Sequence, residues 1–106
     1  MDDCIFCKII KKEISGEFLH EDEHSIVIKD LYPKAKTHLL ILPKKHIPSV
    51  IELEEGDEKI AGHMIKVAKD LAEKLGLKGY KLQINVGKDG GQEVFHLHLH
   101  LLSTFA

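Results

Sequence analysis

The sequence lacks the features that mark secreted, membrane and multidomain proteins. Its first ten residues begin with acidic side chains and contain no basic stretch followed by a long apolar run, so we expect no secretory signal. No later segment reaches membrane-spanning length. Internal repeats, low-complexity tracts and Gly-, Ser- or Pro-rich linkers are also missing. We therefore expect one domain over residues 1–106 that does not enter a membrane.

Blocks of a single charge are missing as well. Charged residues make up 30% of the chain, yet acidic and basic side chains are mixed and the net charge is only -2. Nucleic-acid binding needs concentrated positive charge, so this composition disfavours nucleic acid and favours a small ligand held in a pocket. The only two cysteines, Cys4 and Cys7, are spaced C-x-x-C, which in a chain without an export signal indicates a reducing, cytoplasmic setting.

Hydrophobic spacing predicts an α+β fold. Apolar residues at helical spacing predict a short amphipathic helix over residues 4–12 and a long one over residues 57–75, which Gly76 follows as a C-cap. Strands are predicted over residues 18–21, 25–30, 39–42, 80–86 and 93–102. The run at 39–42 is apolar at every position, which is typical of a central strand buried on both faces.

The last predicted strand alternates three histidines, His96, His98 and His100, with leucines. A period of two places the imidazoles on one face of the strand and the leucines on the other, with successive rings roughly 7 Å apart. Solvent-facing histidines over an apolar core would explain one such residue but hardly three. A metal centre built from all three histidines stays open as an alternative.

A glycine-rich loop, Gly90-Gly91-Gln92-Glu93, leads directly into these histidines. Glycine lets a backbone approach an anion closely, so the loop's N–H groups are candidates for binding phosphate. By itself an Asp-Gly-Gly sequence usually marks only a hairpin turn. Its position next to the histidines favours the phosphate interpretation.

Three segments resemble the histidine triad family. Residues 96–102 match the family signature, in which His-x-His-x-His is followed by apolar residues, while residues 30–47 resemble its nucleoside-binding hairpin and residues 85–92 its phosphate loop. The resemblance is strongest to the histidine triad nucleotide-binding proteins that act as purine nucleoside phosphoramidases. It implies an antiparallel five-stranded sheet with one long helix and a short N-terminal helix.

The resemblance also implies catalytic roles. His98 would attack the α-phosphorus to form a covalent nucleotidyl-histidine, which divides one difficult displacement into two easier ones. Attack requires neutral imidazole, and an unperturbed histidine, with a pKa near 6.5, is largely neutral at about pH 7. His100 and His38 would flank the phosphate and assist with charge and proton transfer.

For the nucleotide, the resemblance implies a shared set of ligands. Asp30, beside Leu31, would accept hydrogen bonds from the ribose hydroxyls, although an acid before Pro33 can also be a simple turn residue. The phosphate oxygens would be held by Asn85, Gly91 and Gln92 and by the backbone of Glu93 and Leu99. Some relatives have a small hydroxyl residue at position 93, so we expect only the backbone of Glu93 to be a ligand.

A structural zinc site is a further expectation. The Cys4–Cys7 pair supplies half of a tetrahedral site. Metal-binding members of the family complete it with histidines that correspond to His46 and His96. Such a site would tie the N-terminal helix to the sheet; the alternative is two reduced cysteines on a helix face.

Three classes of function remain open: a nucleotidyl hydrolase, a nucleotide-binding regulatory module without turnover, and a zinc enzyme that uses the three histidines as ligands. The presence of all three triad histidines with His38, Asn85 and Gln92 favours the hydrolase. Purine nucleotides or nucleoside phosphoramidates are then the expected ligands, and dinucleoside polyphosphates are the alternative substrates. The family also implies a homodimer, formed through the long helix and the strand near Tyr80. No role is assigned to His20, His24 or His63.

Overall fold

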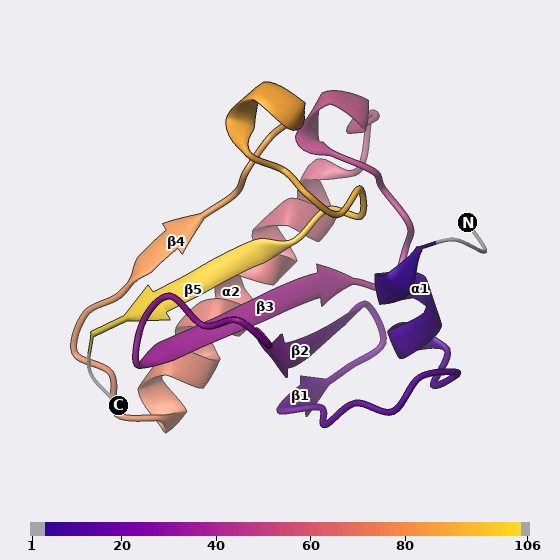
Figure 1. Ribbon diagram of the computed structural model, residues 1–106. Helices are drawn as coiled ribbons and strands as arrows, with labels where there is room; N and C mark the ends of the chain where they lie inside the picture. The colour runs from indigo at the N-terminus through magenta and orange to yellow at the C-terminus, as the bar shows by residue number, and fades with distance from the viewer. Residues whose placement is uncertain (1–3, 105–106) are drawn as a thin grey trace.

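A five-stranded antiparallel sheet is the frame of the computed structural model, which describes residues 4–104 (Figure 1). Its strand order is β1-β2-β3-β5-β4, so β3 is central and β1 and β4 are the edges. The strands are β1 (His20–Glu21), β2 (Ser25–Lys29), β3 (Thr37–Pro43), β4 (Lys81–Gln83) and β5 (Leu99–Ser103). The predicted sheet and its central strand are therefore confirmed.

Two helices cover opposite faces of the sheet. The long helix α2 (Glu58–Lys74) packs behind it, and the short helix α1 (Ile5–Ile10) lies at one end of the other face (Figure 1). Gly76, with φ of 74°, ends α2 because the amides of Gly76 and Leu77 turn back to the carbonyls of Glu73 and Ala72. Within residues 4–104 no helix is both long and apolar enough to cross a membrane.

Two apolar clusters fill the space between these layers. Under α2, alternate strand residues such as Val27, Leu39 and Ile41 join Met64 and Val67 of the helix. On the other face, Phe6 of α1 is packed with the remaining strand side chains, Ile26, Ile28, Leu40 and Leu42. Because both faces are covered, β3 is apolar at consecutive positions, as the sequence indicated.

The last strand is shorter than predicted. It begins at Leu99, not at residue 93, so among the triad histidines only His100 lies in a regular strand. Residues 93–98 instead cross the end of β3: the Leu97 amide donates to the Ile47 carbonyl at 2.6 Å, outside the sheet. Pro43, the last residue of β3, has no N–H to offer another strand.

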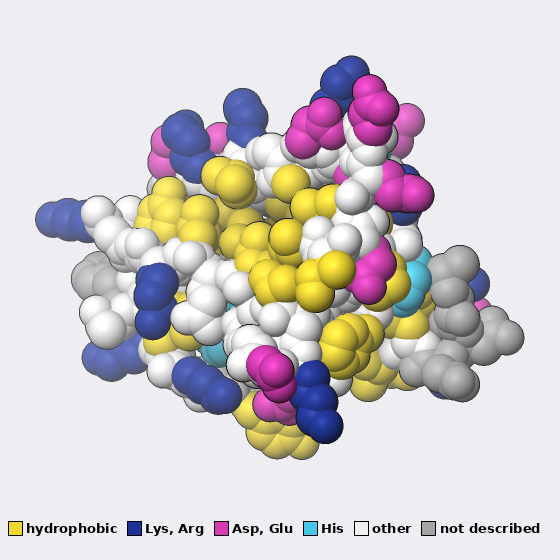
Figure 2. All heavy atoms as spheres, turned by 90° about the horizontal axis from the view of Figure 1, so that it is seen from above, with side chains coloured by type: hydrophobic (Ala, Val, Ile, Leu, Met, Phe, Trp, Pro, Cys, Tyr) yellow, Lys and Arg dark blue, Asp and Glu magenta, His cyan; other side chains and the backbone are white. Residues whose placement is uncertain are grey.

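Two short 3-10 helices stand at one end of the sheet, η1 (Val50–Glu52) and η2 (Lys88–Gly90). Figure 2 looks down on this end and shows apolar side chains gathered across much of the face. Ile51 and Phe95 are 72% and 47% exposed. Aromatic residues in alternating strands commonly fill the core. Phe95 does not, because about half of its surface is exposed.

Candidate functional site

The triad histidines and the intervening leucines occupy opposite faces, as their alternation predicted. Leu97, Leu99 and Leu101 belong to the cluster under α2, whereas His96 and His98 are buried on the other face. The ring centroids of His98 and His100 are 4.9 Å apart, closer than the roughly 7 Å expected from the strand rise. The value of roughly 7 Å applies to Cα atoms two residues apart in a strand, whereas the side chains of His98 and His100 bring their rings closer together.

One ring nitrogen of His98 is hydrogen-bonded, and in residues 4–104 no hydrogen bond involves the other. Its Nδ1 lies 2.7 Å from the main-chain oxygen of His96, and because a carbonyl can only accept, Nδ1 carries the proton. The lone pair is therefore on Nε2. Burial lowers the pKa of His98 below its ordinary value, outweighing the hydrogen bond to His96 and the charge of Asp30, which raise it. The ring is consequently neutral near pH 7, the form that a nucleophile requires.

Hydrogen bonds also fix the protons of His38 and His100. The backbone N–H of Lys34 donates to His38 Nδ1 at 3.1 Å, so His38 carries its proton on Nε2. That Nε2 lies 2.8 Å from His100 Nδ1, which must accept, and the proton of neutral His100 is left on its outer nitrogen, Nε2. In the sheet, His100 is paired with Leu40 and lies diagonal to His38.

The electrostatics keep this pair uncharged in the free protein. Burial, helped by His98 and His38, lowers the pKa of His100 to about 4. Burial also lowers the pKa of His38, against the nearby carboxylate of Asp30, whose Oδ2 is 3.4 Å from His38 Nε2. A bound anion would favour protonation of the same pair.

Asp30 is a turn residue that also borders the histidine cluster, and its predicted contact with ribose stays a prediction. Its Oδ1 accepts the Tyr32 amide at 2.8 Å, which makes it a turn residue at the start of the loop between β2 and β3. Its Oδ2 faces His38, so the carboxylate also borders the histidine cluster. Leu31 and Tyr32 follow with 84% and 82% of their surface exposed, which leaves their side chains free to cover a ligand.

The glycine loop uses several of its own amides. Three of its amides are bonded within the loop: Gly90 and Gln92 donate to the Gly87 carbonyl, and Gly91 to that of Lys88. The 3-10 turn η2 uses these groups internally. The amides of Gly90, Gly91 and Gln92 thus have partners inside the loop, and the role of Gly91 as a phosphate ligand stays a prediction.

The side chain of Gln92 is committed to the same loop. It is 5% exposed; its Oε1 accepts the Gly87 amide at 2.9 Å, and its Nε2 donates to the carbonyls of Pro48 at 2.7 Å and Val94 at 3.0 Å. All of its donors are thereby used. Gln92 therefore braces the loop, and its predicted contact with phosphate oxygens stays a prediction.

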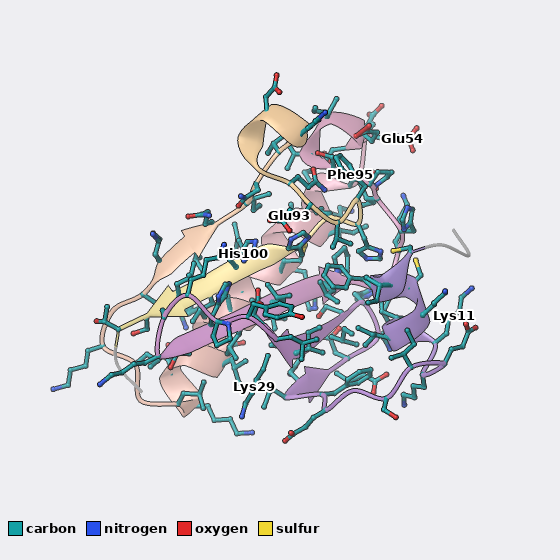
Figure 3. All side chains as sticks on the ribbon, in the orientation of Figure 1. Lys11, Lys29, Glu54, Glu93, Phe95 and His100 are labelled. Carbon is teal, nitrogen blue, oxygen red and sulfur yellow. The ribbon has the colours of Figure 1, made fainter. Side chains whose placement is uncertain are left out.

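The other expected phosphate ligands lie around this braced loop. Asn85 Nδ2 is 3.4 Å from the Gly91 carbonyl, a long contact that a ligand could replace. Glu93 is exposed on the segment that leads to β5 (Figure 3). Leu99 begins β5 opposite Ile41, with its side chain buried under α2, so only its backbone can face the histidines.

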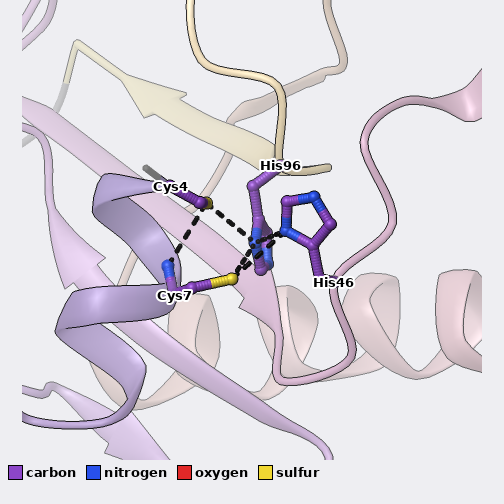
Figure 4. Close-up of side chains that lie close together, drawn as sticks. All are labelled: Cys4, Cys7, His46 and His96. Atoms are coloured by element: carbon purple, nitrogen blue, oxygen red, sulfur yellow. Dashed lines mark hydrogen bonds between the residues drawn. The ribbon is translucent and has the colours of Figure 1, made fainter. Parts of the chain in front are cut away.

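Cys4, Cys7, His46 and His96 are brought together, as the family resemblance implied (Figure 4). One ligand atom from each lies within 4.8 Å of all the others. His96 Nε2 donates to the Pro43 carbonyl at 2.8 Å, so its Nδ1 lone pair faces the two sulfur atoms, 3.5 Å from each. His46 Nδ1 is 3.2 Å from Cys7 Sγ and 3.1 Å from His96 Nδ1. This group could hold a metal ion.

The triad itself is divided between separate groups. Among residues 4–104, His96 belongs to the cysteine cluster, and His100 belongs to a second group of potential ligands with Asp30 and His38. His98 is in neither group. Since the three histidines do not converge on one point, the arrangement disfavours a metal centre built from all of them.

A second histidine network was missed by the sequence analysis. Asp22 Oδ2 accepts from His20 Nε2 at 2.7 Å and from His63 Nε2 at 2.9 Å. Burial would raise the pKa of Asp22, but these and other hydrogen bonds outweigh it and hold the pKa far below its ordinary value. The network ties the β1–β2 hairpin to α2. Asp22 itself was recognisable as a turn residue, whereas its contact with His63 depends on the tertiary fold.

Comparisons with known proteins agree with this geometry. The family model described as scavenger mRNA decapping enzyme C-term binding matches residues 3–105. Protein HitA of Neisseria gonorrhoeae is 44% identical over 105 residues, covering 98% of this chain and 98% of that protein. Purine nucleoside phosphoramidase of Escherichia coli (strain K12) is 41% identical over 103 residues, covering 95% of this chain and 87% of that protein.

Solved structures point the same way. A HIT family hydrolase from Legionella pneumophila Philadelphia 1 superposes with a TM-score of 0.93 at 42% identity, covering 98% of this chain and 95% of that one. One from Clostridium thermocellum gives a TM-score of 0.93 at 48% identity, covering 97% of this chain and 91% of that one. The chain therefore belongs to the histidine triad (HIT) family, and it is a hydrolase of that family.

Proposed function

We propose that the protein hydrolyses purine nucleoside phosphoramidates, or related conjugates of nucleoside 5′-monophosphates, at the α-phosphate. The observation that carries this proposal is the state of His98, a buried neutral imidazole whose Nδ1–H is bonded to the His96 carbonyl and whose Nε2 has no hydrogen-bond partner in the described part of the chain. The 41% identity to a purine nucleoside phosphoramidase supports the substrate class.

In the first step, His98 Nε2 attacks the α-phosphorus. A bond forms between Nε2 and phosphorus while the bond from phosphorus to the amine nitrogen breaks. The departing nitrogen needs one proton, and the outer nitrogen of His100 is the proposed donor. His100 enters this step protonated, a state favoured by the negative charge of the bound phosphate and by Asp30, whose charge raises the pKa of His100. In this state His100 Nδ1 donates to His38 Nε2, so the proton of His38 moves to its Nδ1 and the hydrogen bond from the Lys34 amide is lost.

In the second step, water attacks the same phosphorus. The bond to His98 Nε2 breaks, the nucleoside monophosphate leaves, and the proton released by water returns to His100. The cycle thus consumes one water and regenerates both histidines. Asp30 and the exposed Leu31 are proposed to bind the nucleoside, and Asn85 with the backbones of Gly91, Glu93 and Leu99 to line the phosphate site. Gln92 supports that site from within the loop.

Intact-protein mass spectrometry after brief mixing with adenosine 5′-phosphoramidate tests this proposal. We expect AMP release and a transient AMP adduct in the unchanged protein, and at least a 1000-fold loss of turnover, about 4 kcal/mol, in His98→Ala. His24→Ala, whose side chain is 63% exposed, is the matched control and should retain activity. Tight AMP binding without turnover would refute the proposal and favour a regulatory module, whereas cleavage of dinucleoside polyphosphates alone would favour the alternative substrate.

We also propose that Cys4, Cys7, His46 and His96 bind a structural zinc ion. Usual bond lengths place the ligand atoms of a tetrahedral zinc site about 3.3–3.8 Å apart. The nitrogen–sulfur distances of 3.2–3.5 Å and the nitrogen–nitrogen distance of 3.1 Å come near this range. The ion would tie α1 to the loop before β5, and it takes no part in the chemistry.

Metal analysis with and without a chelator tests the zinc proposal. We expect one zinc per chain and, on its removal, a lower melting temperature with hydrolysis retained at low temperature. Cys7→Ser should reproduce the loss of metal. Absence of bound zinc from protein refolded in its presence would contradict this proposal without affecting the hydrolase.

We also propose that the protein forms a homodimer and acts in the cytoplasm. β4 is an edge strand, and apolar side chains on and near α2 and β4 are exposed: Ile65 at 51%, Leu75 at 46% and Tyr80 at 38%. Pairing of two such faces would cover these side chains and extend the sheet. Light scattering of the unchanged protein and of Ile65→Lys tests this, with a monomer in both cases contradicting it.

A further inference from the structure

Phe6 contacts two histidines of the triad. Its ring centroid lies 5.2 Å from that of His98 and 6.0 Å from that of His96, with the ring planes at 80° in both cases. This is the edge-to-face arrangement that aromatic pairs prefer. Phe6 is 8% exposed and is anchored by the apolar cluster on the face opposite α2, so its ring is itself firmly placed.

His98 needs such a neighbour. Its hydrogen bond to the His96 carbonyl fixes the position of Nδ1 but leaves the ring able to swing about that point, and the swing moves Nε2. The His100 ring restrains it from one direction at 4.9 Å, and the Phe6 ring contacts it at nearly a right angle. Small displacements of a reacting atom carry large rate penalties, so the ring that limits the swing influences the reaction.

We infer that Phe6 is a positioning residue whose ring holds the imidazole of His98 so that Nε2 faces the α-phosphorus. This inference rests on the proposed function. Phe6 lies between Cys4 and Cys7 on α1, and Cys7 Sγ and Cys4 Sγ both lie 3.5 Å from His96 Nδ1. The helix α1 and its N-cap residue, Cys4, therefore supply both sulfur atoms and also the ring that packs on His98.

Steady-state kinetics on two substitutions test the inference. In Phe6→Leu, kcat should fall by about 3- to 10-fold, which is about 0.6–1.4 kcal/mol, while KM changes by less than about 2-fold. Phe6→Tyr, which keeps the ring, should recover most of kcat. Phe18→Leu is the matched control: Phe18 packs against the same apolar cluster, and none of the contacts between aromatic rings in residues 4–104 involves it. Its kcat should be unchanged.

Proton NMR of the substrate-free protein gives an independent readout. The unchanged protein should show nuclear Overhauser contacts between the Phe6 and His98 rings, and Phe6→Leu should remove the ring-current shift of His98 without altering the fold. Missing contacts in the unchanged protein would overturn the inference. So would a Phe6→Leu variant that keeps kcat, or one in which KM rises alone, since that pattern belongs to substrate binding. If no protein turns over phosphoramidate, the proposed function fails, and the NMR result still decides whether Phe6 restrains His98.

Discussion

Replacement of Gln92 by glutamate tests whether this side chain braces the loop or binds phosphate. The two side chains have nearly the same shape, but an ionised carboxylate has no hydrogen to donate. Gln92 Nε2 donates to the carbonyls of Pro48 and Val94, so Gln92→Glu would place a negative oxygen against two carbonyl oxygens in a buried site.

The buried glutamate would be forced to take up a proton. Holding a carboxyl with a reference pKa of about 4.3 in its neutral form at pH 7 costs about 3.7 kcal/mol, at 1.36 kcal/mol per pH unit. The neutral acid can still donate to one carbonyl, and the other hydrogen bond is lost at about 1 kcal/mol. Gln92→Glu should therefore destabilise the protein by about 3–5 kcal/mol at pH 7, a large share of the 5–15 kcal/mol typical of a domain.

This cost should shrink in acid. The folded state binds the extra proton and the unfolded state does not, so the variant's relative stability is lost as pH rises above about 4.3 and regained as pH falls. Between pH 7 and pH 5 the gap to the unchanged protein should narrow by nearly 3 kcal/mol, by the same conversion.

Urea unfolding at the two pH values measures this gap. Gln83→Glu is the control, because Gln83 is exposed and its amide donates to the side chain of Asn85. The cost of this substitution should stay within about 0.5 kcal/mol at both pH values. A Gln92→Glu protein that unfolds like the original at both pH values, yet has lost kcat/KM, would refute the brace. Gln92 would then act on the phosphate, as the family resemblance implied.

Two further predictions concern the histidines. Asp22→Asn should lower the free energy of unfolding in urea by about 1–3 kcal/mol, because an amide N–H2 would replace an oxygen that accepts from His20 and His63. The control Asp70→Asn, at an exposed position, should lower it by less than about 0.5 kcal/mol, and equal losses would contradict the network. Because the pKa of His100 is lowered to about 4 from 6.5, unfolding takes up a proton between these values, so its contribution to stability is present above pH 6.5 and is lost as pH falls toward 4. Urea unfolding between pH 7 and pH 4.5 should follow this sign, and His100→Gln should flatten the slope; an unchanged slope would contradict the shift.

The elements with a strong period were predictable from the sequence. The long helix α2 carries apolar residues every three or four positions, and the structure begins and ends it one residue inside the predicted range. The apolar run of β3 correctly predicted the central strand. The helix buries one stripe of side chains and the strand buries both faces, and each kind of burial requires apolar residues at positions that can be read from the sequence.

The ends of the strands and the hydrogen bonds of the loops were harder to predict from the sequence. Alternation assigned the triad histidines to the correct face, but where β5 begins depends on where its partners β3 and β4 end, which residues 93–98 do not encode. Likewise, Gly87 and Gly91 adopt the positive φ values that glycine permits, yet the sequence does not reveal that η2 turns its amides inward. Gln92 finds its Pro48 partner 44 residues away.

The group of four potential metal ligands was predicted partly from local spacing and partly from the family resemblance. The C-x-x-C spacing indicated two ligands locally, and only the family resemblance implied His46 and His96 as the others. The structure brings all four together because β3 ends at Pro43, whose carbonyl holds His96 by Nε2. The contact of Phe6 with His98 had no signal in the sequence beyond an apolar residue on a helix face.

His96 serves the two sites through different parts of one residue. Its imidazole faces the sulfur atoms, whereas its carbonyl holds the proton of His98. Every amino acid supplies a carbonyl, but few supply a nitrogen ligand. In a descendant that lost the cysteines, the side chain at position 96 would keep its hydrogen bond to Pro43 and its contact with Phe6, whereas the carbonyl that holds the proton of His98 would remain whatever the residue.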